Sequence, residues 1–259
     1  MKIGVCCNIN RARVAAAVGY DYAEFNLSKV ATMTDDEFDA LVAEKNTLGL
    51  PVPSFNGFCP SDIRLTVGID EHSLSSYAEK AFSRAQRIGG EIVVVGSGRS
   101  RAIPDGYDLT AAKNEFVRAL ALIDKYARRY GIRLALEPLS KGDTNFMNTL
   151  SDAAEICSVL GSDNVGCTLD LFHFDRNGEP MSDIKKYGEF IIHTHLARRN
   201  ADRRIPTLDE QDEVEEFVGA LRDIDYNGRM SLEGTFYPDF EPSLTAAMQL
   251  FRAIGVKNI

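Results

Sequence analysis

The feature that most constrains this chain is a regular alternation of short apolar runs with amphipathic segments. Eight such runs occur along the 259 residues, at 3–7, 22–26, 50–55, 91–96, 132–137, 165–170, 190–196 and 229–234. A continuous apolar run of this length is typical of a strand that is buried on both faces. Eight buried strands with helices between them, in a chain of about 250 residues, predict a (β/α)8 TIM barrel of the α/β class. We expect one such domain over residues 1–259.

The segments between the apolar runs carry signals for the starts and ends of helices. The stretch 110–130 places apolar residues at helical spacing, and Gly131 follows where a helix would end. Capping residues or acids in a first turn predict helix starts at Thr34, Asp108, Ser151–Asp152 and Asp209–Glu210.

A doubly wound parallel sheet is the other fold in which strands and helices alternate in this way. Such a sheet normally carries a glycine-rich turn after its first strand, whereas this chain continues Cys7-Asn8-Ile9-Asn10-Arg11. The longest irregular stretches, 56–71 and 97–109, follow the third and fourth strands. A barrel carries its active-site loops at these places, so the barrel is the expected fold.

Charge and composition exclude several classes of partner. The chain has 29 Lys and Arg against 38 Asp and Glu, a net charge of −9, which argues against nucleic acid or an acidic membrane as a partner. It has no apolar stretch of about 18 residues and no apolar run after a basic segment at its start, so we expect a cytoplasmic protein. The cysteines show no CxxC spacing, and we expect structural thiols at Cys6, Cys7, Cys59, Cys157 and Cys167.

Ionisable residues end four successive strands of the expected barrel. Glu137, Asp170, His195 and Glu233 each close an otherwise apolar run. The C-terminal ends of barrel strands meet at one mouth, and buried ionisable groups need a partner or a metal. Three carboxylates at one mouth would repel one another unless a divalent cation lay among them. These four residues are therefore the first candidates for a functional site.

Five motifs surround these residues: LALEPLSKGDTNFMNT at 134–149, LDLFHF at 169–174, HTHLA at 193–197, DRRIP at 202–206 and SLEGTF at 231–236. Together they resemble the sugar phosphate isomerase/epimerase family of xylose isomerase-like barrels, which includes ketose 3-epimerases, hydroxypyruvate isomerase and inosose dehydratases. The segment SGRSRAIPDGYD at 97–108 also resembles a loop of this family. The order Glu, Asp-x-x-His, His-x-His, Glu over four strands carries the resemblance.

The resemblance implies that Glu137, Asp170, His195 and Glu233 hold one divalent metal ion. Three oxygen donors and one imidazole suit Mn²⁺ or Mg²⁺, and Zn²⁺ or Co²⁺ are the alternatives. The resemblance also makes Glu137 and Glu233 the catalytic acid-base pair. They would remove and return a proton next to a carbonyl, through a metal-stabilised enediolate.

Contacts to the substrate are implied for His173, Arg203, Arg204, Asp143 and Asn145. His173 resembles a histidine that donates a hydrogen bond to an oxygen near the carbonyl. The two arginines resemble one substrate-binding arginine, and the sequence does not separate them. Asp143 stands where ketose epimerases have a glutamate.

The expected function is that of a divalent-metal-dependent isomerase or epimerase of a small ketose, keto-polyol or sugar phosphate. A small carbohydrate is the expected partner, and the resemblance implies a homo-oligomer, either a dimer or a tetramer. The alternatives are an inosose-type dehydratase, which begins with the same proton abstraction, and a catalytically inactive sugar-binding subunit. The endonuclease IV group binds three zinc ions through more histidines than the 4 present here.

Other polar residues near these motifs have structural interpretations. His193 is expected to be a satisfied core residue, and His72 is expected to be solvated. Glu24 lies in the second strand and is equally consistent with lining the mouth or with a structural role. Arg198 and Arg199 add to the arginines after the seventh strand, of which at least one is expected to contact substrate.

Overall fold

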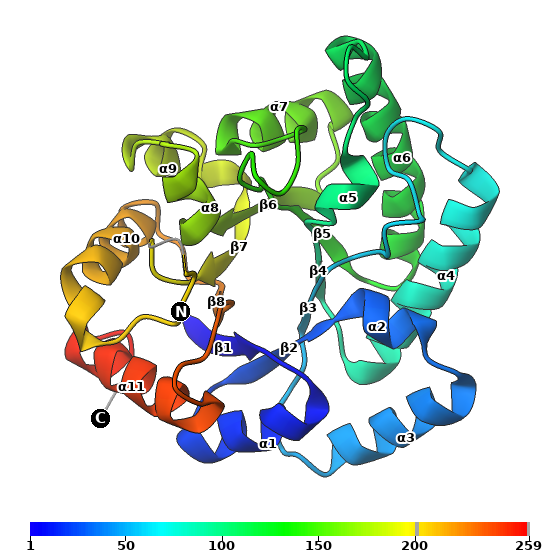
Figure 1. Ribbon diagram of the computed structural model, residues 1–259. Helices are drawn as coiled ribbons and strands as arrows, with labels where there is room; N and C mark the ends of the chain where they lie inside the picture. Colours follow the sequence, from blue (N-terminus) through cyan, green and yellow to red (C-terminus); the bar gives the residue numbers. More distant parts are fainter. Residues whose placement is uncertain (200–201, 258–259) are drawn as a thin grey trace.

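Eight parallel strands close into a barrel in chain order, and β1 pairs with both β2 and β8 (Figure 1). The computed structural model describes residues 1–199 and 202–257. The (β/α)8 TIM barrel predicted from the alternation is therefore confirmed. The strands are β1 Lys2–Cys6, β2 Tyr22–Asn26, β3 Ser54–Asn56, β4 Ile92–Val95, β5 Arg133–Leu136, β6 Val165–Asp170, β7 Ile191–Leu196 and β8 Arg229–Leu232.

Helices connect successive strands and surround the barrel (Figure 1). Their apolar faces pack on the outer face of the strands and form the main hydrophobic core. The helices are α1 Ile9–Val18, α2 Leu27–Thr32, α3 Asp35–Asn46, α4 Glu71–Ile88, α5 Gly98–Arg101, α6 Leu109–Arg129, α7 Leu150–Leu160, α8 Leu171–Arg176, α9 Ser182–Lys186, α10 Gln211–Asp223 and α11 Phe240–Ala253, with 3₁₀ turns η1 Gly188–Phe190 and η2 Leu208–Glu210.

The third strand begins later than its apolar run. β3 covers Ser54–Asn56 rather than 50–55, because Pro51 and Pro53 have no N–H to donate to a neighbouring strand. Their carbonyls still serve the sheet: Pro51 O accepts from Ala23 N and Pro53 O accepts from Ile92 N, both at 3.0 Å.

Side-chain caps set the starts of the long helices. Thr34 caps α3 and Asp108 caps α6, as predicted. α7 begins before the predicted Ser151–Asp152, because Thr149 is its N-cap and Asp152 completes a capping box with it. The helix predicted at Asp209–Glu210 starts with the turn η2, and α10 follows it.

The barrel interior has an apolar part and a polar part. Ile92, Val94 and Ala135 form a small buried cluster against which Ile192 packs. These residues come from β4, β5 and β7, so the cluster lies across the interior. Another part of the interior holds fully or almost fully buried polar side chains, namely Tyr22, Glu24, Ser54, His193 and Ser231.

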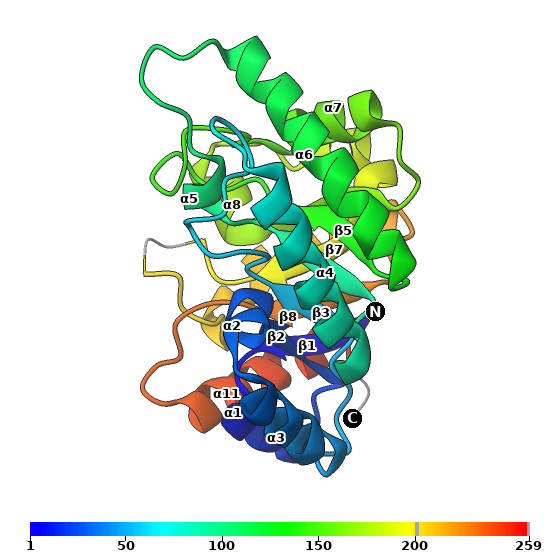
Figure 2. The same ribbon diagram turned by 90° about the vertical axis from the view of Figure 1, so that its right-hand side faces the viewer.

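The loops that follow the C-terminal strand ends gather on one face of the barrel. α5 and α8 lie on this face, and the N-terminus lies at the opposite end (Figure 2). The long loops expected at 56–71 and 97–109 belong to this face, since they follow β3 and β4, and α5 lies within the second. In the described ranges, no helix has both the length and the apolar character that crossing a membrane requires.

Candidate active site

The four predicted metal ligands lie at the C-terminal ends of four neighbouring strands. Glu137 and Glu233 directly follow β5 and β8, Asp170 ends β6, and His195 lies in β7. One donor atom from each residue lies within 4.8 Å of the others. Glu137, Asp170 and His195 are buried. The carboxylates and the imidazole therefore converge inside the mouth of the barrel.

His195 is surrounded by carboxylates. Its Nδ1 lies 2.7 Å from Glu137 Oε1 and 3.1 Å from Glu233 Oε2, and its Nε2 lies 2.9 Å from Glu24 Oε1. Burial alone would lower the pKa of His195, but the charges of Glu233 and Glu24 outweigh burial and raise this pKa well above its ordinary value. A proton on this imidazole would balance part of the negative charge of the surrounding carboxylates.

Arg203 supplies a second positive charge to the same cluster. Its Nη2 donates to Asp170 Oδ2 at 2.6 Å and to Glu233 Oε2 at 2.7 Å, and its Cζ lies 4.9 Å from the centre of the Phe172 ring. Burial alone would raise the pKa of Glu233, but His195 and Arg203 lower it well below its ordinary value. The Arg203 guanidinium thus bridges two of the three carboxylates of the donor cluster and neutralises part of their charge.

The backbone at Arg203 adopts a conformation that is uncommon outside glycine, with φ of 49°. Its carbonyl accepts a hydrogen bond from Thr235 N at 2.7 Å. A Cβ atom at residue 234 would overlap this carbonyl oxygen, so Gly234 permits the loop after β7 to pack against the end of β8. This packing directs Arg203 into the mouth, and such backbone strain is typical of a functional position.

The structure separates the two arginines that the sequence does not. Arg204 stacks on Tyr237, with its Cζ 4.0 Å from the ring centre, and its Nε pairs with Asp202 at 3.1 Å. Its side chain is thus engaged with loop residues, in contrast to that of Arg203. The remaining arginines of this loop are paired as well, Arg198 with Asp202 and Glu210 and Arg199 with Glu216.

His173 is buried beside Asp170. Its Nδ1 accepts a hydrogen bond from Ser140 N at 3.1 Å, which leaves the proton of a neutral ring on Nε2. That Nε2 lies 3.8 Å from Asp170 Oδ2, at the edge of the donor cluster. His173 can therefore present an N–H to a ligand in the mouth.

Asp143 and Asn145 occupy different surroundings. Asp143 lines the cleft above the donors and accepts a hydrogen bond from Ser140 Oγ. Asn145 Oδ1 accepts from Ile103 N at 3.0 Å, and its Nδ2 donates to Ile103 O at 2.8 Å. Both polar atoms of Asn145 thus join two loops, and the structure does not bring this side chain to the donor cluster.

Glu24 lies inside the barrel and contacts the donor cluster from within. It is fully buried, and its Oε2 accepts from Ser54 Oγ at 2.9 Å, Ser231 Oγ at 2.6 Å and His193 Nε2 at 2.8 Å. Burial alone would raise the pKa of Glu24, but the two histidines lower it well below its ordinary value. The other carboxylate oxygen faces His195 Nε2, so Glu24 orients this ring with Nδ1 toward the remaining donors.

Three neutral residues that the sequence analysis did not single out also shape the cluster. Asn56 Nδ2 donates to Glu233 Oε1 at 2.6 Å, and Asn26 Nδ2 donates to Asn56 Oδ1 at 3.3 Å. Gly96 leaves room for Glu137, because a Cβ at this position would overlap the carboxylate. Asn26 and Asn56 end β2 and β3, and Gly96 follows β4. Inspection of every strand end, rather than only the ionisable ones, would have found them.

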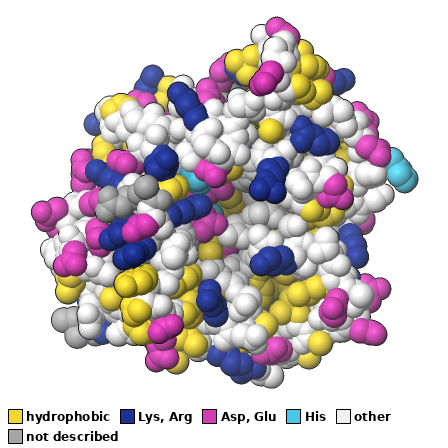
Figure 3. Space-filling model, in the orientation of Figure 1, with side chains coloured by type: hydrophobic (Ala, Val, Ile, Leu, Met, Phe, Trp, Pro, Cys, Tyr) yellow, Lys and Arg dark blue, Asp and Glu magenta, His cyan; other side chains and the backbone are white. Residues whose placement is uncertain are grey.

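The donor cluster opens into a cleft on the loop face. A cavity of about 300 Å³ is lined by Glu137, His173, Arg203 and Glu233. A second cavity of about 610 Å³ shares Glu233 with it and reaches the loops after β1, β2 and β8. Figure 3 shows this face with a central hollow that acidic and basic side chains surround. These volumes are typical of sites for small molecules.

A model of the xylose isomerase-like TIM barrel family matches residues 12–254 of this sequence. The chain belongs to this family. The resemblance inferred from the motifs is thereby confirmed.

Two curated relatives are similar to part of this chain. An inosose isomerase of Halalkalibacterium halodurans is 29% identical over 140 residues, which are 49% of this chain and 48% of that protein. A D-psicose 3-epimerase of Enterocloster bolteae is 33% identical over 119 residues, 45% of this chain and 38% of that protein. The matches span less than half the length of these curated relatives.

Solved structures resemble the whole barrel. A D-psicose 3-epimerase crystallised in the presence of D-fructose superposes with a TM-score of 0.82 at 18% identity, over 98% of this chain and 99% of that chain. The IOLI protein with a bound zinc atom gives a TM-score of 0.77 at 20% identity, over 100% of this chain and 99% of that chain. At these identities the likeness shows the fold.

Proposed function

We propose that the protein is a divalent-metal-dependent isomerase or epimerase of a small ketose, keto-polyol or sugar phosphate. The observation that carries this proposal is the placement of two carboxylates, Glu137 and Glu233, 2.7 Å and 3.1 Å from the Nδ1 atom of His195 at the bottom of one cleft. Relatives named inosose isomerase and D-psicose 3-epimerase support the same reaction class.

The metal would be held by Glu137, Asp170, His195 and Glu233. Three oxygen donors and one nitrogen donor suit Mn²⁺ or Mg²⁺, and the zinc in a structural neighbour keeps Zn²⁺ and Co²⁺ as alternatives. When bound, the ion would polarise the carbonyl next to the reacting carbon and favour an enediolate.

Glu137 and Glu233 would carry out the proton transfers. One carboxylate takes a proton from the carbon next to the carbonyl. Return of a proton to the opposite face of that carbon gives an epimer, and return to the former carbonyl carbon gives an isomer. The low pKa of Glu233 keeps this carboxylate ionised at neutral pH.

His173 and Arg203 would position the substrate. The His173 Nε2–H would donate to an oxygen near the carbonyl. Arg203 lines the cleft, and its guanidinium would donate to a hydroxyl or a phosphate of the substrate. Asp143 at the cleft wall would accept from a substrate hydroxyl. The homo-oligomer and the cytoplasmic location stay predictions.

Proton exchange in D₂O tests this function. The Mn²⁺-loaded protein is incubated with D-fructose, D-psicose, D-tagatose and an inosose, and deuterium at the carbon next to the carbonyl is followed by NMR. We expect label in substrate and product for at least one compound, and a loss of ~100-fold or more in Glu137→Gln and Glu233→Gln. Turnover without label would contradict the roles given to the glutamates. Loss of water from the labelled compound would identify the dehydratase instead.

A further inference from the structure

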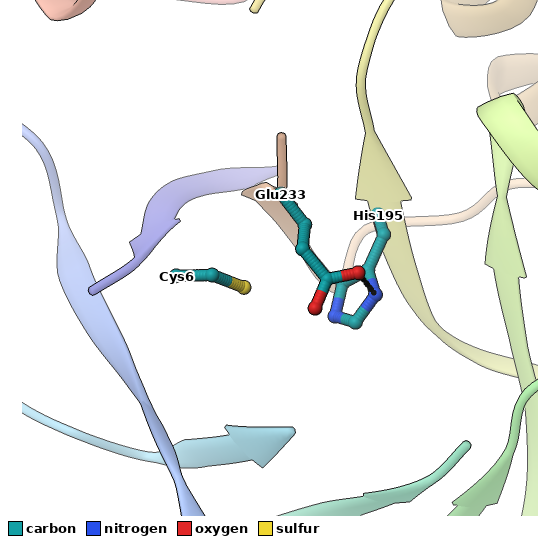
Figure 4. A group of neighbouring side chains, drawn as sticks. All are labelled: Cys6, His195 and Glu233. Atoms are coloured by element: carbon teal, nitrogen blue, oxygen red, sulfur yellow. Dashed lines mark ion pairs between the residues drawn. The ribbon is translucent and has the colours of Figure 1, made fainter. Parts of the chain in front are cut away.

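Cys6 lies beside two of the donors, across the seam where the barrel closes. It ends β1, and β1 pairs with β8 through Val5 and Leu232, so Glu233 is its neighbour on the adjoining strand. Figure 4 shows the thiol directed toward the Glu233 carboxylate, with the His195 ring behind it. One donor atom each of Cys6, His195 and Glu233 lies within 4.8 Å of the others.

This group is distinct from the four-ligand set, although it shares His195 and Glu233 with it. The four ligands come from β5 to β8, whereas Cys6 adds a sulfur donor from β1 on the other flank of β8. Glu233 Oε2 lies 3.1 Å from His195 Nδ1, and Glu233 Oε1 accepts from Asn56 Nδ2 at 2.6 Å. Cys6 also lines the 610 Å³ cavity, which gives a dissolved ion access to the thiol.

We propose that Cys6, His195 and Glu233 form a second coordination set, which takes thiophilic divalent ions such as Zn²⁺, Cd²⁺ or Co²⁺. Thiolate and imidazole ligands select such ions, whereas an oxygen-rich set suits Mn²⁺ or Mg²⁺. A thiol, an imidazole and a carboxylate supply three positions of a tetrahedral site, and solvent supplies the fourth. Binding forms a sulfur–metal bond, and the thiol proton passes to solvent.

The inference rests on the proposed function, because the two sets of ligands share His195 and Glu233. Binding of an ion to the second coordination set therefore affects the proposed metal site. An ion on Cys6 engages His195 and Glu233, so these two groups are no longer free for an ion in the oxygen-rich set. A thiophilic ion bound to Cys6 therefore competes with Mn²⁺ for His195 and Glu233. Removing the sulfur is expected to relieve that competition.

The test compares Cys6→Ser with Cys7→Ser, a change at the neighbouring cysteine that lies outside the group. Cd²⁺ and Co²⁺ are added to each full-length protein, and the thiolate-to-metal charge-transfer absorption is recorded. We expect this absorption in the parent and in Cys7→Ser and its loss in Cys6→Ser, with Cd²⁺ affinity lowered ~10-fold or more. Mn²⁺ affinity is expected to stay within about twofold in all three proteins, because the four oxygen and nitrogen ligands are intact.

Absence of the absorption in the parent, or its persistence in Cys6→Ser, would overturn the second coordination set. Thermal unfolding confirms that each variant is folded, and Cys6→Ala repeats the comparison with a side chain that cannot bind metal. If Mn²⁺ binds but Cd²⁺ shows no dependence on Cys6, the inference fails alone. If Mn²⁺ does not bind and the Cd²⁺ absorption depends on Cys6, the proposed function fails and the inference stands.

Discussion

Glu24→Gln is expected to weaken metal binding although Glu24 is not a ligand of the proposed metal. The carboxylate is fully buried, and it accepts from His195 Nε2 at 2.9 Å with one oxygen and from His193 Nε2 at 2.8 Å with the other. Glutamine has the same size but replaces one acceptor by an NH₂ donor. If the NH₂ faces His195, it favours the tautomer with a proton on Nδ1, which cannot bind a metal through that atom.

The size of this effect follows from the hydrogen bonds that change. If the NH₂ faces His193 instead, that ring can change tautomer, because its Nδ1 has no partner among the described residues. The bond to His195 then becomes neutral rather than charge-assisted, a difference of about 1 to 1.5 kcal/mol. The loss in metal affinity is therefore expected to be ~10-fold, within the ~10- to 100-fold range for groups that orient metal ligands.

Calorimetric titration with Mn²⁺ measures this loss. Glu179→Gln is the control, because Glu179 is a half-buried glutamate that does not belong to the donor cluster. The His195 tautomer in the Glu24→Gln protein, read from ¹⁵N NMR, separates an effect on this ring from a general loss of structure. A folded Glu24→Gln protein that binds Mn²⁺ within about twofold of the parent would refute the reasoning.

The remaining predictions concern the mouth and one half-buried carboxylate, that of Glu179. Arg203→Lys is expected to cost ~2 to 4 kcal/mol in kcat/KM, and Arg204→Lys less than ~0.5 kcal/mol, on any substrate that is turned over; parent-like kinetics in both would exclude the proposed contact. Gly96→Ala should displace the Glu137 carboxylate and lower Mn²⁺ affinity ~10-fold in a titration; unchanged binding would contradict this steric argument. Burial raises the pKa of Glu179 to about 7, above its unfolded value, so its stabilising protonation is lost as pH rises from about 5 to about 8. Over that range, urea unfolding should show the parent losing about 1 to 2 kcal/mol more stability than Glu179→Gln, and equal losses would refute the assignment.

The fold and the four metal-ligand candidates could be predicted because each leaves a short local pattern in the sequence. Each strand is buried on both faces and therefore appears as a continuous apolar run. An ionisable residue at the end of such a run is conspicuous, as with Asp170 at the end of β6. The start of β3 was predicted wrongly at residue 50, because Pro51 and Pro53 lie in the apolar run but contribute only their carbonyls to the neighbouring strands.

The supporting residues could not be assigned because their roles depend on contacts between distant strands or on backbone conformation. Arg203 and Arg204 have the same side chain, but Arg203 contacts the donor cluster and Arg204 contacts Tyr237. The backbone has a positive φ at Arg203, which the sequence does not reveal. Glu24 lies within β2, and its structural role depends on His193 and His195 from the far side of the barrel. Closure of the barrel brings Cys6 of β1 beside Glu233 after β8, and no local sequence pattern indicates this contact.

Closure of the barrel also sets an order of events during folding. The hydrogen bond from Ser231 to Glu24 joins residues 207 positions apart, and Cys6 meets Glu233 across the same seam. Contacts between such distant segments have a high cost in loop entropy and form slowly. A nascent chain that has not yet delivered β8 lacks Glu233 and has only three of the four oxygen and nitrogen ligands. Binding of the proposed metal by all four ligands would therefore follow the docking of the last strand, and the bound ion would slow the separation of β1 from β8.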